Sequence, residues 1–167
     1  MEAIIIRHAD AGERDSAKYP DDSLRPLSAD GKREMLRLAR GMRKLGIEFD
    51  DIFDSGFARA RQTSLCVCEA YGIDPATIRT LKQLAPEADP ADTASELRKL
   101  RGLKRVALVG HEPQLSRFAG YLLTGDTDLK MELKKGGVIR LEVVRWIAGS
   151  ATLHAMLPPK ALRKIGK

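Results

Sequence analysis

The sequence has little cysteine and contains no repeated or low-complexity segment. Its two cysteines, Cys66 and Cys68, form a C-x-C pair, which is neither a zinc knuckle nor a redox-active C-x-x-C motif. We therefore interpret them as buried free thiols in a reducing compartment. The shortage of cysteine also excludes a scaffold held together by disulfide bonds.

Long apolar runs are absent as well. The apolar run at the N-terminus, Ile4–Ile6, is cut off by Arg7. A transmembrane helix needs about 18 consecutive apolar residues, and a signal peptide also has a longer apolar region than this one. The sequence therefore predicts neither a membrane anchor nor a secretory signal, and we expect a cytoplasmic protein with no membrane partner.

What is present is the composition of one globular domain. The chain has 167 residues, of which 43% are hydrophobic and 31% are charged. These values are close to globular averages, and a chain of this size buries roughly 68–70% of its unfolded surface without a metal or disulfide. We predict one domain over residues 1–157, followed by a basic C-terminal tail at 158–167, and we expect a monomer.

The order of predicted elements is β-α-β-α-β, which indicates an α/β fold. Residues 3–6, 52–53 and 105–110 are predicted as buried strands, and helices are predicted after Ser28 and from about 58 to 71. Residues 138–146 and 151–156 alternate as a hairpin would, with a turn at 147–150. We expect a three-layer α/β/α sandwich whose mostly parallel sheet has an antiparallel C-terminal edge.

Reactive side chains follow three of these strands. Arg7 and His8 follow the first, Ser55 leads to Arg59 after the second, and His111 follows the third. Parallel strands place their carboxyl ends at one edge of the sheet, where such folds bind ligands. Arginine binds phosphate oxygens two at a time, and histidine can act as nucleophile, acid or base. The pattern therefore predicts a site for a phosphoryl group.

The same residues resemble the motifs of a known family. Arg7-His8-Ala9 resembles the R-H-G signature of the histidine phosphatase superfamily, the segment 55–63 resembles its S-P-x-x-R-A-x-Q-T motif, and Val109-Gly110-His111 resembles its V-x-H motif. Ala9 and Gly56 depart from the pattern, and both are small residues. The short length and the segment 23–28 resemble the SixA-type branch of small phosphohistidine phosphatases, which lacks a large helical insert.

This resemblance implies roles for individual residues. His8 would be the nucleophile that becomes transiently phosphorylated, and Arg7, Arg59 and His111 would hold the phosphate oxygens. Cationic donors of this kind stabilise the charge of phosphoryl transfer, so the resemblance implies no metal and no cofactor. The substrate would be a phosphorylated protein domain carrying phosphohistidine, or a small phosphate compound.

The remaining candidates for the site are less well defined by the sequence. We favour Glu87 as the general acid because of its loop position, with Asp89, Asp10 and Glu112 as alternatives. Ser55 could cap the following helix or donate to phosphate. The resemblance of the R-P-L segment to that of the SixA-type branch implies that Arg25 lies at the rim of the phosphate pocket.

The charge of +6 leaves other functions open. Residues 1–83 hold 14 basic and 14 acidic residues, whereas residues 84–167 hold 15 and 9. Alternatives to a phosphohistidine phosphatase are a phosphatase of sugar phosphates or small esters, and a non-catalytic module that binds phosphate or nucleic acid. Nucleic acid is not the partner we expect, because the basic stripe in the first helix is interpreted as a solvated face. Its members are Arg33, Arg37, Arg40, Arg43 and Lys44.

Overall fold

A computed structural model describes residues 1–167. Its single sheet has six strands in the order β3-β2-β4-β1-β5-β6. The strands are β1 (Glu2–Arg7), β2 (Asp51–Asp54), β3 (Ile78–Thr80), β4 (Arg105–Gly110), β5 (Val138–Val143) and β6 (Ala151–Leu157). The first four run parallel, and β5 and β6 are antiparallel to their neighbours, as predicted.

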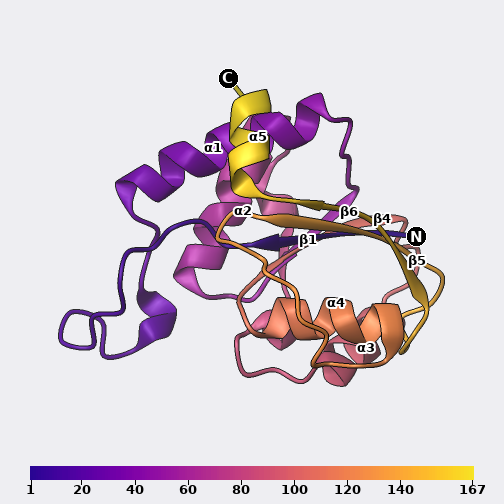
Figure 1. Cartoon of the computed structure of the whole chain (residues 1–167). Coiled ribbons are helices and arrows are strands. Elements are labelled where there is room, and N and C mark those ends of the chain that lie inside the picture. Colours follow the sequence, from indigo (N-terminus) through magenta and orange to yellow (C-terminus); the bar gives the residue numbers. More distant parts are fainter.

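Five helices cover the two faces of the sheet (Figure 1). Three lie on one face: α1 (Ala29–Lys44), α2 (Ala58–Tyr71) and α5 (Pro159–Ile165). The other face is covered by α3 (Pro90–Lys99) and α4 (Gln114–Thr124). The predicted three-layer sandwich without a large helical insert is therefore confirmed. No helix is long and apolar enough to cross a membrane.

Each face of the sheet has its own core, because successive strand residues point to opposite sides. On β1, Ile4 and Ile6 belong to the core under α1 and α2, whereas Ala3 and Ile5 belong to the core under α3 and α4. All four are fully buried. A strand that is apolar on both faces is typical of a central parallel strand, and this explains why β1 and β4 read as continuous apolar runs.

The boundaries of the central helices follow the sequence signals. The Ser28 hydroxyl accepts from the Gly31 amide at the start of α1, and Gly72 ends α2 in the left-handed conformation. The hairpin differs from the prediction at one end, because β5 ends at Val143 rather than at Trp146. The chain bends after Val143, and the Trp146 ring lies 6.4 Å from the Phe118 ring of α4.

The C-terminal residues also differ from the prediction. We expected a tail at 158–167, but Pro159–Ile165 form α5, which packs on α1. Leu162 is fully buried in the core of that face. The close approach is possible because Gly41 and Gly166 have no side chains, and a Cβ on either would overlap the backbone of the other helix. These ten residues are therefore packed as part of the domain.

Candidate active site

The carboxyl ends of β1, β2 and β4 meet at one edge of the sheet. Because β4 pairs with both other strands, the residues that follow the three strands come together. The rings of His8 and His111 lie 4.9 Å apart, and the Ser55 hydroxyl oxygen lies 2.7 Å from Nε2 of His111. The structure thus brings together three residues that are more than 40 positions apart in the sequence.

The position of the His8 proton follows from one hydrogen bond. Its Nδ1 atom lies 2.6 Å from the Ala9 carbonyl oxygen, which can only accept, so Nδ1 carries the proton and donates. The pKa of His8 is lowered to about 4: burial lowers it most, the Ala9 hydrogen bond raises it, and the charges of Arg59, Arg7 and Lys135 lower it. His8 is therefore neutral near pH 7, with a free electron pair on Nε2.

His111 is held in a similarly buried position, and only 1% of it is exposed. Burial lowers the pKa of His111 to about 2, and the neighbouring His8 and Arg59 act in the same direction. The ring packs against Phe57 at 4.8 Å. The Ser55 hydroxyl also accepts from the Phe57 amide at 3.3 Å, just before α2 begins, and α2 has no side-chain cap at Phe57 itself.

The two arginines reach the site from different elements. Arg59, in the first turn of α2, is only 4% exposed and its guanidinium lies 5.1 Å from the Phe57 ring. Its two Nη atoms donate to the Asp22 backbone oxygen at 2.7 Å and to the Asp22 carboxylate at 3.0 Å. Arg7, at the end of β1, donates from Nη1 to the Leu133 carbonyl at 2.8 Å.

Three nitrogen atoms of these residues are buried without a hydrogen-bond partner: Nε of Arg7, Nε of Arg59 and Nδ1 of His111. Buried polar atoms are nearly always paired, so three of them in one site require an explanation. An anion with several acceptor oxygens, such as a phosphoryl group, would pair with all three. The arrangement is thus suited to hold a tetrahedral anion next to the free Nε2 of His8.

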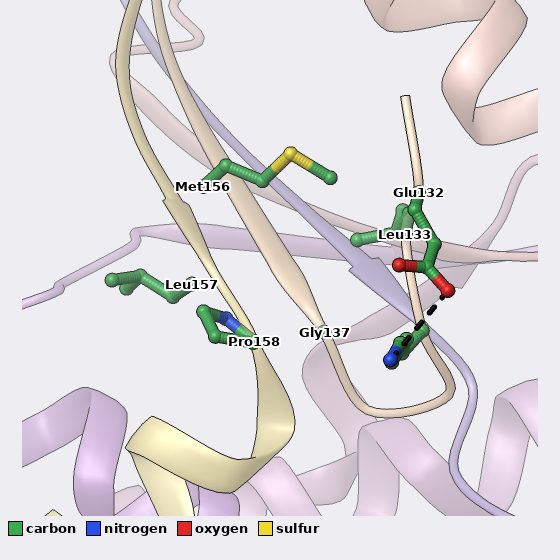
Figure 2. Close-up of a pocket in the computed structure, with 7 residues that line it drawn as sticks. Glu132, Leu133, Gly137, Met156, Leu157 and Pro158 are labelled. Carbon is green, nitrogen blue, oxygen red and sulfur yellow. Dashed lines mark ion pairs between the residues drawn. The ribbon is translucent and has the colours of Figure 1, made fainter. Parts of the chain in front are cut away.

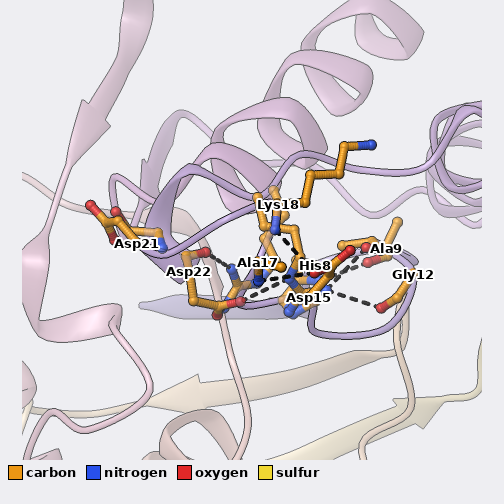
Figure 3. A network of polar contacts seen from close by, with 12 residues as sticks. His8, Ala9, Gly12, Asp15, Ala17, Lys18, Asp21 and Asp22 are labelled. Atoms are coloured by element: carbon orange, nitrogen blue, oxygen red, sulfur yellow. Dashed lines mark hydrogen bonds and ion pairs between the residues drawn. The ribbon is translucent and has the colours of Figure 1, made fainter.

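Arg25 is predicted to lie at the rim of the phosphate pocket, and its contacts in the structure are to neighbouring loop residues. Its Nε donates to the Asp22 carboxylate at 2.8 Å, and its Nη1 donates to the Ala11 and Gly12 carbonyls at 3.0 Å. Figure 3 shows Asp22 and the neighbouring loop residues beside His8. Asp22 therefore links Arg25 to Arg59, a role that the sequence analysis missed because it searched this loop for positive charge alone.

The last two residues of the segment 55–63, Gln62 and Thr63, have a structural role here. The Thr63 hydroxyl donates to the Arg59 carbonyl at 2.8 Å and accepts from the Ala9 amide at 3.1 Å. The Gln62 side-chain oxygen accepts from the Leu27 amide at 2.8 Å. Both side chains therefore fasten the loops that follow His8 and precede α1 to the helix that carries Arg59.

The four candidate acids lie in different surroundings. Asp89 caps α3 by accepting from the Ala91 amide at 2.7 Å, and Glu112 accepts from Ser116 at 2.6 and 3.0 Å. Asp10 pairs with Lys135 at 2.7 Å, and this bond lowers the pKa of Asp10 to about 2. Glu87 is exposed in the turn after Leu84 and makes no hydrogen bond or ion pair. Three of the four carboxylates are therefore engaged with other groups, and Glu87 makes no hydrogen bond to His8.

A segment before β5 completes the edge of the site. The Gly136 amide donates to the Arg7 and His8 carbonyls at 3.0 and 3.2 Å, and Lys135 lies close enough to His8 to lower its pKa. Figure 2 shows the same segment facing the end of β6 across a shallow pocket, with Leu133 and Gly137 among its lining. The segment before β5 thus borders the site next to the loop that follows β1.

Comparison with known proteins agrees with this geometry. A family model described as the histidine phosphatase superfamily (branch 1) matches residues 3–89, which include Arg7, His8 and Arg59. The chain belongs to the histidine phosphatase superfamily. This membership supports phosphatase activity. No group of three or more His, Cys, Asp or Glu side chains is arranged to hold a metal ion.

Individual relatives place the chain in the SixA-type branch. It is 30% identical to phosphohistidine phosphatase SixA of Escherichia coli over 76% of this chain and 77% of the relative. An uncharacterized protein of Picosynechococcus is 31% identical over 93% of this chain and 90% of the relative. The structure of the protein histidine phosphatase SixA complexed with tungstate has the same fold, with a TM-score of 0.82, 24% identity, and coverage of 97% and 99% of the two chains.

Proposed function

We propose that this protein removes the phosphoryl group from phosphohistidine on another protein, by way of a phosphorylated His8. The observation that supports the proposal best is the free Nε2 of His8 beside three unpaired buried nitrogen atoms of Arg7, Arg59 and His111. The SixA of E. coli, a relative at 30% identity, is named a phosphohistidine phosphatase. The proposed nucleophile and the proposed phosphate donors thus follow strands that end at the same edge of the sheet.

In the first step, the Nε2 electron pair of His8 attacks the phosphorus of the substrate. The new P–N bond to His8 forms as the P–N bond to the substrate imidazole breaks, and the imidazole leaves with the bonding pair and takes up a proton. Arg7 and Arg59 balance the negative charge on the phosphoryl oxygens in the transition state. His111, neutral because of its burial, contributes a hydrogen bond rather than a charge.

In the second step, water attacks the phosphorus of phosphorylated His8. The P–Nε2 bond breaks, inorganic phosphate forms, and His8 returns to its neutral form with the proton still on Nδ1. The Ala9 carbonyl supports both steps, because it fixes the proton on Nδ1 and stabilises the positive charge that develops on the ring.

We further propose that Glu87 protonates the leaving oxygen when the substrate is a phosphate ester. An alkoxide is a poor leaving group and needs such an acid, whereas an imidazole leaves more readily. Glu87 is the one candidate acid whose carboxylate is not held by another group. Because only the ester needs an acid for its leaving group, the contribution of Glu87 should depend on the substrate.

The test compares two kinds of substrate on the wild type and on Glu87→Gln. We expect kcat/KM to be higher for a phosphohistidine peptide than for p-nitrophenyl phosphate or a sugar phosphate, in the presence of EDTA. Glu87→Gln should lower ester hydrolysis and leave phosphohistidine hydrolysis unchanged. Higher efficiency on sugar phosphates would instead favour a small-ester phosphatase, and absence of turnover on every substrate would favour a binding module.

A further inference from the structure

The positive charge of the protein is concentrated on two helices that are distant in sequence. Helix α1 and the C-terminal residues 159–167 together hold ten basic and two acidic residues. The rest of the chain holds 19 basic and 21 acidic residues, so it carries a small negative charge. The excess of +6 therefore arises from these two segments. We call their ten basic residues the basic face: Lys32, Arg33, Arg37, Arg40, Arg43, Lys44, Lys160, Arg163, Lys164 and Lys167.

The two helices form one continuous surface. They pack directly on each other through Leu162 and the glycines Gly41 and Gly166, and Figure 1 shows α5 lying across α1. The apolar side of α1, which includes Met35, is buried against the sheet. The basic side chains are thus displayed on a rigid support and need no ordering of the backbone on binding.

Few of these charges are neutralised within the molecule. Arg33 pairs with Asp30, and Arg163 pairs with Glu34. Lys44 donates to the Lys167 oxygen at 2.6 Å, and no Asp or Glu side chain pairs with the remaining exposed members: Lys32, Arg37, Arg40, Arg43, Lys160 and Lys164. Arg37, Arg40 and Lys44 follow one another at spacings of three and four residues, where like charges repel and destabilise a helix. A surface needed only for solubility would gain from alternating signs, so this arrangement points to an anionic partner.

The chemistry of the face selects among anionic partners. Leu45 is the one large apolar residue exposed at the end of α1, and α1 and α5 contain no aromatic residue. Insertion into a lipid surface uses exposed apolar and aromatic side chains, and the anchors of protein interfaces are enriched in tryptophan and tyrosine as well as arginine. Contacts to the backbone of a nucleic-acid duplex need neither, because arginine and lysine bind the phosphates directly.

We propose that the basic face binds the phosphate backbone of duplex nucleic acid, at a place separate from the phosphatase site. The interpretation of α1 as a solvated face considered that helix alone, whereas α5 adds four basic residues and no acidic one beside it. From Arg33 to Lys44 the stripe extends about 17 Å along the helix axis. This length matches several successive phosphates, so binding without sequence preference and with strong salt dependence is expected.

The test measures binding of a fluorescent 20-base-pair DNA duplex by anisotropy, with inorganic vanadate added to occupy the phosphatase site. The test variant, Arg37→Glu/Arg40→Glu/Lys164→Glu, reverses three unpaired charges of the basic face. The control variant, Lys82→Glu/Arg101→Glu/Lys104→Glu, makes the same change in charge at exposed, unpaired positions outside it. Turnover of p-nitrophenyl phosphate checks that both variants are folded.

We expect the test variant to weaken binding at least tenfold and to reduce the slope of log K against log salt by about 3, whereas the control should change binding less than threefold. Equal weakening by both variants would overturn the proposal, because binding would then follow net charge alone. Displacement by vanadate would place the DNA in the phosphatase site instead. Equally tight binding to polyglutamate or to phosphatidylserine vesicles would assign the face to an acidic protein or a membrane and also overturn it.

Discussion

Asp22 should control how well Arg59 stabilises the transferring phosphoryl group. Its carboxylate lies 3.0 Å from Nη2 of Arg59 and 2.8 Å from Nε of Arg25, and its backbone oxygen accepts from Nη1 of Arg59 at 2.7 Å. These bonds occupy one edge of the Arg59 guanidinium and leave the buried Nε unpaired. Asp22 is therefore a positioning residue, which acts on the substrate through Arg59.

The expected size of the effect follows from the contacts that Asp22→Ala removes. A hydrogen bond between charged groups contributes about 1.5–3 kcal/mol, and the bond to Arg59 is nearly buried on the arginine side. If the transition state loses that stabilisation, kcat falls by about tenfold to a hundredfold. Asp22→Asn keeps an oxygen that can accept from Arg59, so its loss should be several-fold smaller.

The assay is steady-state hydrolysis of p-nitrophenyl phosphate, with inhibition by vanadate as a second measure of how well the site holds an oxyanion. Asp21→Ala is the matched control, because Asp21 accepts only from the Ser23 amide on the surface. The reasoning is refuted if Asp22→Ala keeps kcat within twofold of the wild type, or if Asp21→Ala loses as much. A rise in activity would show that the Asp22 carboxylate competes with phosphate for Arg59.

Three further predictions concern burial and packing. Burial lowers the pKa of His8 from 6.5 to about 4, so the neutral ring contributes fully to stability above pH 6.5. As the pH falls towards 4, the free energy of unfolding should decrease by up to about 3 kcal/mol. Urea unfolding at several pH values should show that the free energy of unfolding depends less on pH in His8→Gln. Ser55→Ala removes the bond to Nε2 of His111 and should lower kcat about tenfold, whereas an unchanged kcat would mean that the ring is held by packing alone. Gly41→Ala should lower the free energy of unfolding by about 1–3 kcal/mol, since its Cβ would overlap the Leu162 carbonyl. At an ordinary helix position the same substitution stabilises the protein. Thermal denaturation should therefore show a lower melting temperature for Gly41→Ala, and a higher one would contradict the prediction.

The elements with strong local signals could be predicted from the sequence. The apolar runs of β1 and β4 and the cap at Ser28 led to the correct layers, and the rule that parallel strands share an edge brought His8 near His111. These features depend on interactions between near neighbours and on one general property of parallel sheets. Prediction therefore succeeded where local pattern and global fold agree.

The features that were missed depend on contacts between distant segments. Nothing near Asp22 indicates that it pairs with Arg59, 37 positions away, and nothing near Lys135 indicates its ion pair with Asp10. The C-terminal helix has only one buried large residue, Leu162, so its docking on α1 could not be read from its own periodicity. Dividing the charge by halves of the sequence likewise hid the basic face, because acidic residues elsewhere in the first half offset the charge of α1.

The most direct test of the central claim is to trap the phosphorylated enzyme. The protein is mixed with a ³²P-labelled phosphohistidine peptide, quenched within milliseconds in alkali, and digested for mass spectrometry. The account predicts a label on His8 that is stable in alkali and lost in acid, and that is absent from His8→Asn, in which folding is checked by circular dichroism. Full turnover with no labelled His8, or a label that persists in His8→Asn, would contradict it.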